Sequence, residues 1–284
     1  MRFISYSAGT VPGVAISQDG RYRGLPVPSL GGDLQSFLGR PGELAGLTDR
    51  LSTAPEISLD AVTLLPPVTR PGKILCIGLN YRAHSAESGF EVPTYPTVFA
   101  RFANGTVAHG APLVRPKVSD LFDYECELAV VIGARGRHID IDRALDHVAG
   151  YAAFNDGSVR DFQMKSPQWT MGKAFDDTGA FGPELVTPEE LPPGCRGLRI
   201  RTILNGEVLQ EADTADMIFD VATLVSTLSE AMTLEPGDVI VTGTPDGVGA
   251  LRDPQVWLKP GDEVTIDIEQ VGTLTNPVVQ EGDR

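Results

Sequence analysis

The chain has 284 residues, 42% of them hydrophobic and 21% charged, and no apolar stretch approaches the roughly 18 residues that a membrane span needs. Its net charge of −15 repels phosphate backbones, so we expect neither a nucleic-acid nor a membrane partner. Three widely spaced cysteines and the lack of an apolar export segment exclude a disulfide scaffold and predict a cytoplasmic protein.

The N-terminal part is expected to form a small domain. Residues 2–24 have the pattern of short strands with a turn at Asp19-Gly20, and residues 33–53 are weakly helical with a break at Pro41-Gly42. The Pro-rich stretch 55–73 has the composition of a connector. We therefore predict a small domain over residues 1–68 and a larger catalytic domain over residues 69–284.

The larger domain is predicted to be β-rich. Short runs rich in Val and Ile stand between turn signals, which favours strands, and they lie at residues 73–80, 125–133, 150–158, 199–209, 238–244 and 257–276. Within 199–209, Asn205-Gly206 predicts a hairpin turn. Apolar side chains at helical spacing predict one long helix over 214–232, capped by Asp213 or Thr214 and ended by Pro236-Gly237. The predicted class is a β-rich α+β fold.

Three carboxylates on two predicted strands suggest a metal site. Glu125 and Glu127 are two residues apart on a strand, so they point to the same face, and the apolar run after them indicates that this strand is buried. Asp156 lies in a turn at the end of another apolar strand. A solvated strand face and an ordinary turn aspartate are the alternative interpretations. If the three meet, these hard oxygen ligands favour Mg²⁺ or Mn²⁺ over Zn²⁺.

Other polar residues are candidates for chemistry on a substrate. His84 and Glu87 are three residues apart, which would bring them together on one helical turn as a base that activates water. Lys173 and Arg160 could bind a carboxylate, and the Gly-rich stretch 242–249 could present backbone N–H groups to an anion. A surface His–Glu pair, solvated basic residues and a plain turn are the alternatives. No P-loop or dinucleotide-binding pattern is present.

Taken in order, these segments resemble the fumarylacetoacetate hydrolase family, in particular its bacterial acylpyruvase and 2-hydroxyhepta-2,4-diene-1,7-dioate isomerase members. The similarity rests on GLNYRAHSAESG, DYECELAVVIG, GYAAFNDGSVRDFQ, WTMGKAFDDTGAFGP and the stretch from LNGEVLQ to TGTPDGVG, which cover residues 73–250 almost without gaps. Residues 1–70 match only as the variable N-terminal domain that many bacterial members carry.

The resemblance implies a catalytic domain with a mixed β-sandwich roll, in a homodimer. It implies Glu125, Glu127 and Asp156 as ligands of Mg²⁺ or Mn²⁺, and His84, Glu87 and Lys173 as catalytic residues, with the dyad on a segment that orders as a lid. The residues that match positions contacting a 2-oxo acid in relatives are Arg160, Gln163, Lys173 and Thr244.

Two departures from the family pattern are visible. Arg101 stands where the family often has Lys, and Asp177-Thr178-Gly179-Ala180 replaces an F-A-P pattern. The second departure is expected to line the pocket and to alter specificity.

The favoured activity is metal-dependent hydrolysis of a carbon–carbon bond in an acylpyruvate or a fumarylpyruvate-like compound, as in aromatic or amino-acid catabolism. Hydrolysis needs an activated water, and both members of the dyad are present. The same site suits oxaloacetate decarboxylation, and isomerisation or hydration of a 2-hydroxydienoate. A catalytically silent, metal-stabilised binding protein is the alternative of another class.

Overall fold

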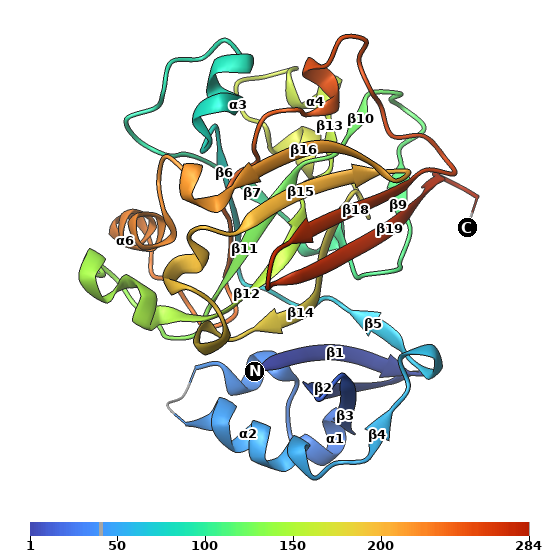
Figure 1. The fold of residues 1–284 in the computed structure, drawn as a ribbon, viewed down its shortest axis with the longest axis vertical. Coiled ribbons are helices and arrows are strands. Elements are labelled where there is room, and N and C mark those ends of the chain that lie inside the picture. Colours follow the sequence, from blue (N-terminus) through green and yellow to red (C-terminus); the bar gives the residue numbers. More distant parts are fainter. Residues whose placement is uncertain (40–41, 284) are drawn as a thin grey trace.

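A large sheet runs through the computed structural model, which describes residues 1–39 and 42–283 (Figure 1). Ten of its twelve strands follow one path, in the order β4 (Glu56–Ile57), β3 (Arg21–Pro26), β2 (Val11–Gln18), β1 (Arg2–Ala8), β14 (Gly179–Val186), β12 (Val148–Asn155), β11 (Cys126–Ile132), β17 (Val239–Val241), β6 (Ile74–Gly78) and β7 (Thr97–Arg101). Off this path, β5 (Thr63–Leu65) pairs with β1, and β8 (Thr106–Val107) pairs with β14.

A second sheet packs on the middle of the first. Its strands follow the order β16 (Glu207–Asp213), β15 (Arg199–Leu204), β18 (Glu263–Ile268), β19 (Gly272–Gln280) and β9 (Leu113–Arg115). These strands cross in front of β11 and β12 in Figure 1, and β15, β18 and β19 contact them directly. The predicted β-rich α+β fold with two packed sheets is thereby confirmed.

Strand β11 is buried on both faces, which explains its continuous apolar sequence. Leu128 and Val130 belong to the core between the two sheets, whereas Ala129 and Val131 belong to a second core on the other face of the large sheet. Because side chains alternate along a strand, Glu127 lies on the face of Ala129 and Val131. This alternation places a carboxylate at the end of an otherwise apolar face.

The N-terminal strands extend the large sheet through β1, which pairs with β14 in the register Phe3↔Leu185. Together with α1 (Val27–Leu30) and α2 (Glu43–Ser52) they form the lower part of Figure 1. The stretch predicted as a connector contains β4 and β5. Of the predicted break at Pro41-Gly42, Pro41 lies outside the described residues. The domain boundary near residue 68 stays a prediction.

Two predicted turns have the geometry that their sequences favour. Asn205 and Gly206 have φ values of 51° and 87° between β15 and β16, and Asp19 and Gly20 have 52° and 74° between β2 and β3. Positive φ at both central residues is typical of the tight hairpin turn whose twist matches that of the strands. Asn, Asp and Gly reach this conformation at little cost, so these short motifs correctly predicted the hairpins.

The predicted helix over 214–232 is wrong at its start. The α-helix α6 spans Val221–Ala231, and Asp220, whose side chain accepts from the backbone N–H of Thr223, is its cap. Ahead of it, Asp213 caps only a short 3-10 turn over Thr214–Asp216, and the backbone N–H groups of Ile218 and Phe219 donate to Asn80 and so are not free to continue a helix. A tertiary contact therefore overrides helical spacing that the sequence showed across both segments.

The helices are short, and those near the end of β6 and β12 surround the site described below. The described part of the chain contains α1 (Val27–Leu30), α2 (Glu43–Ser52), α3 (Arg82–Glu87), α4 (Arg160–Gln163), α5 (Thr170–Lys173) and α6. Within it, we find no helix with the length and apolar character required to cross a membrane. The small pair of strands β10 (Phe122–Asp123) and β13 (Ser158–Val159) leads into α4.

Candidate active site

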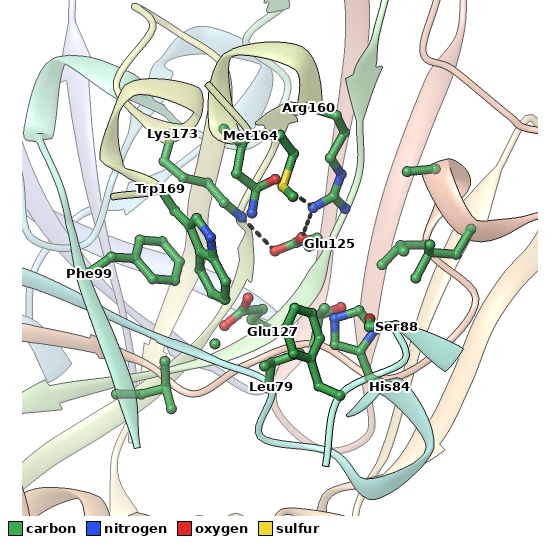
Figure 2. Close-up of a pocket in the computed structure, with 18 residues that line it drawn as sticks. Leu79, His84, Ser88, Phe99, Glu125, Glu127, Arg160, Met164, Trp169 and Lys173 are labelled. Carbon is green, nitrogen blue, oxygen red and sulfur yellow. Dashed lines mark hydrogen bonds and ion pairs between the residues drawn. The ribbon is translucent and has the colours of Figure 1, made fainter. Parts of the chain in front are cut away.

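A cavity of about 270 Å³ opens where α3, α4, α5 and the loop after β17 meet. Every residue that the sequence marked as a possible substrate contact lines it, as do the dyad histidine and both glutamates of the predicted metal site. These residues are His84, Glu125, Glu127, Arg160, Gln163, Lys173 and Thr244. Figure 2 shows most of them converging from separate elements on one space.

The three predicted metal ligands meet beside this cavity, which Glu125 and Glu127 line and Asp156 does not. Glu125, Glu127 and Asp156 are 5%, 1% and 0% exposed, and each offers an oxygen within 4.8 Å of the others. Glu125 immediately precedes β11 and Glu127 lies in it, so both point to one face. Asp156 follows β12, the antiparallel neighbour of β11, and its N–H donates to the carbonyl of Glu125 at 3.0 Å.

Two cations hold Glu125 in place. The Lys173 Nζ lies 2.7 Å from one of its oxygens, and the Arg160 Nη1 lies 2.6 Å from the other (Figure 2). Burial alone would raise the pKa of Glu125, but Lys173 and Arg160 lower it to about 2. Lys173 also contacts Asp156 at 2.6 Å, and although burial opposes its charge, these carboxylates raise its pKa. Glu125 is therefore ionised, and Lys173 is charged, at neutral pH.

Glu127 differs from its two neighbours in the cluster. Its carboxylate accepts from the backbone N–H of Gly243. Burial, followed by the negative charges of Asp156 and Glu125, raises its pKa well above the ordinary value. A carboxylate of this kind either keeps a proton or requires a further positive charge beside it.

These residues fit a hard divalent cation. Three buried carboxylate oxygens lie close enough together to bind one ion, and no thiolate or imidazole belongs to the set. Burial and the neighbouring carboxylates Asp156 and Glu125 raise the pKa of Glu127, and a cation bound beside it would oppose this shift. Glu125, Glu127 and Asp156 could thus hold Mg²⁺ or Mn²⁺, between which the geometry does not discriminate.

The predicted dyad forms within α3. The His84 Nδ1 lies 2.7 Å from the Glu87 Oε1, and His84 is 8% exposed where it lines the cavity. Glu87 also accepts from the backbone N–H of Gly247 at 3.1 Å, which fastens α3 to the Gly-rich loop. A carboxylate that accepts from Nδ1–H leaves Nε2 without a proton, so Nε2 can act as a base.

The Gly-rich stretch 242–249 presents backbone N–H groups to anions of the protein itself. The backbone N–H of Gly243 donates to Glu127, and that of Gly247 donates to Glu87. The N–H of Gly249 donates to Asp123 at 2.8 Å. The loop therefore positions three carboxylates around the cavity. The predicted anion-binding property is present, and these anions are side chains of the chain.

Two buried residues that hold the predicted substrate contacts were not predicted from the sequence. Asp123 accepts from Arg160 at 2.8 Å, and burial raises the pKa of Asp123 although Arg160 opposes the shift. Gln210 donates to the Thr244 hydroxyl at 2.9 Å. Both lie in β-strands, where their only sequence signal is a polar residue at a position that faces the core.

An apolar wall was also not predicted. Phe99 and Trp169 pack edge to face with their ring centres 5.6 Å apart, and Leu79 and Met164 line the cavity with them (Figure 2). Met164 is 71% exposed. Among the described residues that line the cavity, none comes from 177–180, so the expectation that this segment lines the pocket is wrong. Thr178 instead binds the side chain of Arg101, behind Asp156.

The two-sheet fold places three buried carboxylates that could hold a metal ion beside a cavity lined by ionisable side chains. A family model described as "Fumarylacetoacetate (FAA) hydrolase C-terminal" matches residues 73–279, and the chain belongs to the fumarylacetoacetate hydrolase family. A curated relative, the mitochondrial oxaloacetate tautomerase Fahd2a of Rattus norvegicus, is 41% identical over 256 residues, which is 89% of this chain and 81% of that protein.

Two solved structures share the whole fold. A fumarylacetoacetate hydrolase from Exiguobacterium antarcticum matches with a TM-score of 0.84 and 31% identity over 99% of this chain and 100% of that one. Maleylpyruvate hydrolase from Sphingobium sp. SYK-6, in complex with manganese(II) and pyruvate, matches with a TM-score of 0.82 and 27% identity over 99% of each chain.

The predicted cytoplasmic location is contradicted by these relatives. The curated relatives from rat, cattle and human are mitochondrial proteins. The prediction rested on the lack of an apolar export segment, a signal that bears on secretion and carries no information about an organelle.

Proposed function

We propose that the chain catalyses the keto–enol interconversion of a small 2-oxo acid, with oxaloacetate as the first substrate to test. This proposal depends most on the His84–Glu87 dyad, because His84 lines the same cavity as two carboxylates of the cluster, Glu125 and Glu127. Interconversion requires a base that removes a proton from carbon 3 and a site that tolerates the resulting charge on oxygen. The relative named as an oxaloacetate tautomerase supports the choice of substrate.

Each residue of the cavity has a distinct task in this proposal. Glu125, Glu127 and Asp156 would hold Mg²⁺ or Mn²⁺, which when bound supplies Lewis-acid stabilisation of charge on the 2-oxo oxygen. His84 accepts the proton from carbon 3 on Nε2 and delivers it to the 2-oxo oxygen, which gives the enol, while Glu87 fixes the ring.

The remaining polar residues bind and orient the substrate. Lys173 and Arg160 place positive charge beside the substrate carboxylate, even though both already contact Glu125. Gln163 and Thr244 supply hydrogen-bonding groups on the cavity wall. The apolar side chains Phe99 and Trp169 limit the access of water to the reacting carbons.

The test follows the enol of oxaloacetate by its ultraviolet absorbance in the presence of Mn²⁺. We expect the wild-type protein to accelerate interconversion over Mn²⁺ alone, and His84→Asn to lower the rate by about 10²–10⁴ because the base is lost. Mn²⁺ affinity should not change, since His84 is outside the carboxylate cluster.

His138→Asn is the matched control. His138 is exposed and has a φ of 52°, a conformation that asparagine tolerates, so this variant should behave as wild type. A wild-type protein that binds Mn²⁺ but leaves the interconversion rate unchanged contradicts the proposed activity. An unchanged rate in His84→Asn contradicts the role of the dyad.

Carbon–carbon hydrolysis of an acylpyruvate is the second candidate. The same dyad could activate a water, and the Sphingobium neighbour is named as a maleylpyruvate hydrolase and holds manganese with pyruvate. Pyruvate release from acetylpyruvate or fumarylpyruvate would favour this activity, and release from oxaloacetate would favour decarboxylation. Conversion of a 2-hydroxydienoate would favour the isomerase. Metal binding without turnover of any of these compounds would favour a silent binding protein.

A further inference from the structure

Arg101, the last residue of β7, is a cation buried behind the carboxylate cluster. It is 2% exposed and is not among the residues that line the cavity. Its Nη1 lies 2.7 Å from the Asp156 Oδ1, whereas Lys173, which does line the cavity, lies 2.6 Å from the Asp156 Oδ2. Each oxygen of the Asp156 carboxylate therefore contacts a different cation: Oδ1 contacts Arg101, and Oδ2 contacts Lys173 on the side of the cavity.

The guanidinium is fixed by more than this ion pair. Nη1 also donates to the carbonyl of Gly157 at 3.0 Å, and Nη2 donates to the carbonyl of Gly105 and the hydroxyl of Thr178, each at 2.8 Å. The carbonyls of Gly157 and Gly105 belong to the backbone, so a movement of the guanidinium would break its hydrogen bonds to them. Arg101 is thus a rigid contact for Asp156.

We propose that Arg101 is the positioning residue of Asp156, an inference that rests on the metal-dependent function proposed above. By binding Oδ1, the guanidinium directs Oδ2 toward Glu125 and Glu127, which fixes one ligand oxygen of the cluster. Arg101 itself touches neither the cavity nor the substrate. Its contribution is the geometry of the ligand.

Gly179 provides the space that this arginine needs. A Cβ atom at position 179 would lie 2.5 Å from Nη2, 2.6 Å from Cζ and 2.8 Å from Nε of Arg101. Contacts under 3.0 Å essentially never occur for real Cβ atoms, and the guanidinium cannot withdraw without breaking its hydrogen bonds. Gly179 is not among the positive-φ glycines, so space and not backbone conformation requires a glycine here.

Thr178 completes the socket, the set of residues that encloses the Arg101 guanidinium. Its hydroxyl donates to the carbonyl of Phe175 at 2.8 Å, so its oxygen is oriented to accept from Nη2 of Arg101. The two departures from the family pattern, Arg101 and the segment 177–180, are in contact in the structure. The two departures are therefore linked: Arg101 brings a large planar guanidinium, and Thr178 and Gly179 are small enough to leave room for it.

The experiment measures Mn²⁺ affinity by electron paramagnetic resonance in a double-mutant cycle of R101K, G179A and R101K/G179A. G179A keeps every charge but displaces the guanidinium, so we expect its affinity to fall at least tenfold, as is usual when a residue that orients a ligand is disturbed. R101K keeps the charge but loses the fork of donors, and we expect a similar loss.

The double variant shows whether Gly179 acts through Arg101 or whether the two residues affect Mn²⁺ affinity independently. A lysine has no guanidinium plane for the methyl group to meet, so G179A should cost nothing further in the R101K background. A tenfold loss from G179A in both backgrounds, or unchanged affinity in R101K and G179A, would overturn the inference.

Two controls separate this inference from folding and from the proposed function. Gly46→Ala, in α2, has no atom within 4 Å of the added methyl and should match wild type in affinity and thermal unfolding. Because the readout is Mn²⁺ binding, a protein that binds Mn²⁺ without turning over oxaloacetate defeats the proposed function but leaves the role of Arg101 standing.

Discussion

At the scale of single residues, the carboxylates of the cluster are held in different ways. Glu125 contacts Lys173 and Arg160, and Asp156 contacts Lys173 and Arg101. For Glu127, the contact found within the described part of the chain is the backbone N–H of Gly243. Glu127 is therefore the carboxylate on which a bound cation should have the largest effect.

The raised pKa of Glu127 makes the stability of the metal-free protein depend on pH. Below the ordinary value of 4.5, Glu127 is protonated in both the folded and the unfolded chain. Above it, the unfolded chain releases the proton first, so the free energy of unfolding falls as pH rises until the folded pKa is passed. One proton corresponds to a slope of up to about 1.4 kcal/mol per pH unit.

Denaturant unfolding of metal-free protein across this pH range measures the effect. We expect Glu127→Gln to remove this component of the slope, and the matched change Glu207→Gln, at an exposed position on β16, to leave it in place. Equal slopes for Glu127→Gln and wild type would contradict the assignment.

Some residues of the site can be predicted from the local sequence pattern, and others cannot. The spacing of Glu125 and Glu127, followed by an apolar run, correctly predicted two carboxylates on one buried face. Arg101 and Gln210 bind partners 55 and 34 residues away in the chain, and no local pattern encodes such pairs. Their functions became visible only with the pairing of the strands.

At the scale of elements, the buried residue Asn80 joins three segments of the chain. It lies between β6 and α3, and its side chain donates to the carbonyls of Phe219 and Thr242 and accepts from the N–H of Phe219. This contact stops the predicted helix from starting before Val221. Periodicity is local and therefore could predict α6 itself but not the position of its first residue.

We expect Asn80→Ala to lower the free energy of unfolding by about 3 kcal/mol, because it leaves buried backbone groups without partners, each at a cost of about 1–3 kcal/mol. Denaturant unfolding measures this loss. The control Asn104→Ala removes an exposed asparagine and should stay within about 0.5 kcal/mol of wild type. A loss of similar size in both variants would show that Asn80 does not link these elements.

At the scale of the whole molecule, the protein is acidic, whereas the 2-oxo acid proposed as its substrate is an anion. The chain carries a net charge of −15, and the buried cluster contains four carboxylates and three cations when fully ionised. These groups are Asp123, Glu125, Glu127, Asp156, Arg101, Arg160 and Lys173. A divalent cation would change the local charge from one negative to one positive, which is the sign that a 2-oxo acid requires.

The two packed sheets make this concentration of charge possible. Strand β11 is buried on both faces, and the cluster stands at its end, where β11, β12 and β17 meet short helices and loops. The strand pattern predicted the sheets. Which strands are neighbours depends on packing across the whole chain, and that arrangement brings Asp156 to Glu125.

The most direct test of the carboxylate site is anomalous diffraction from crystals grown with Mn²⁺. We predict one manganese peak per chain, coordinated by one oxygen each of Glu125, Glu127 and Asp156. A manganese ion bound elsewhere, or a cluster that binds none at millimolar Mn²⁺, would contradict the account.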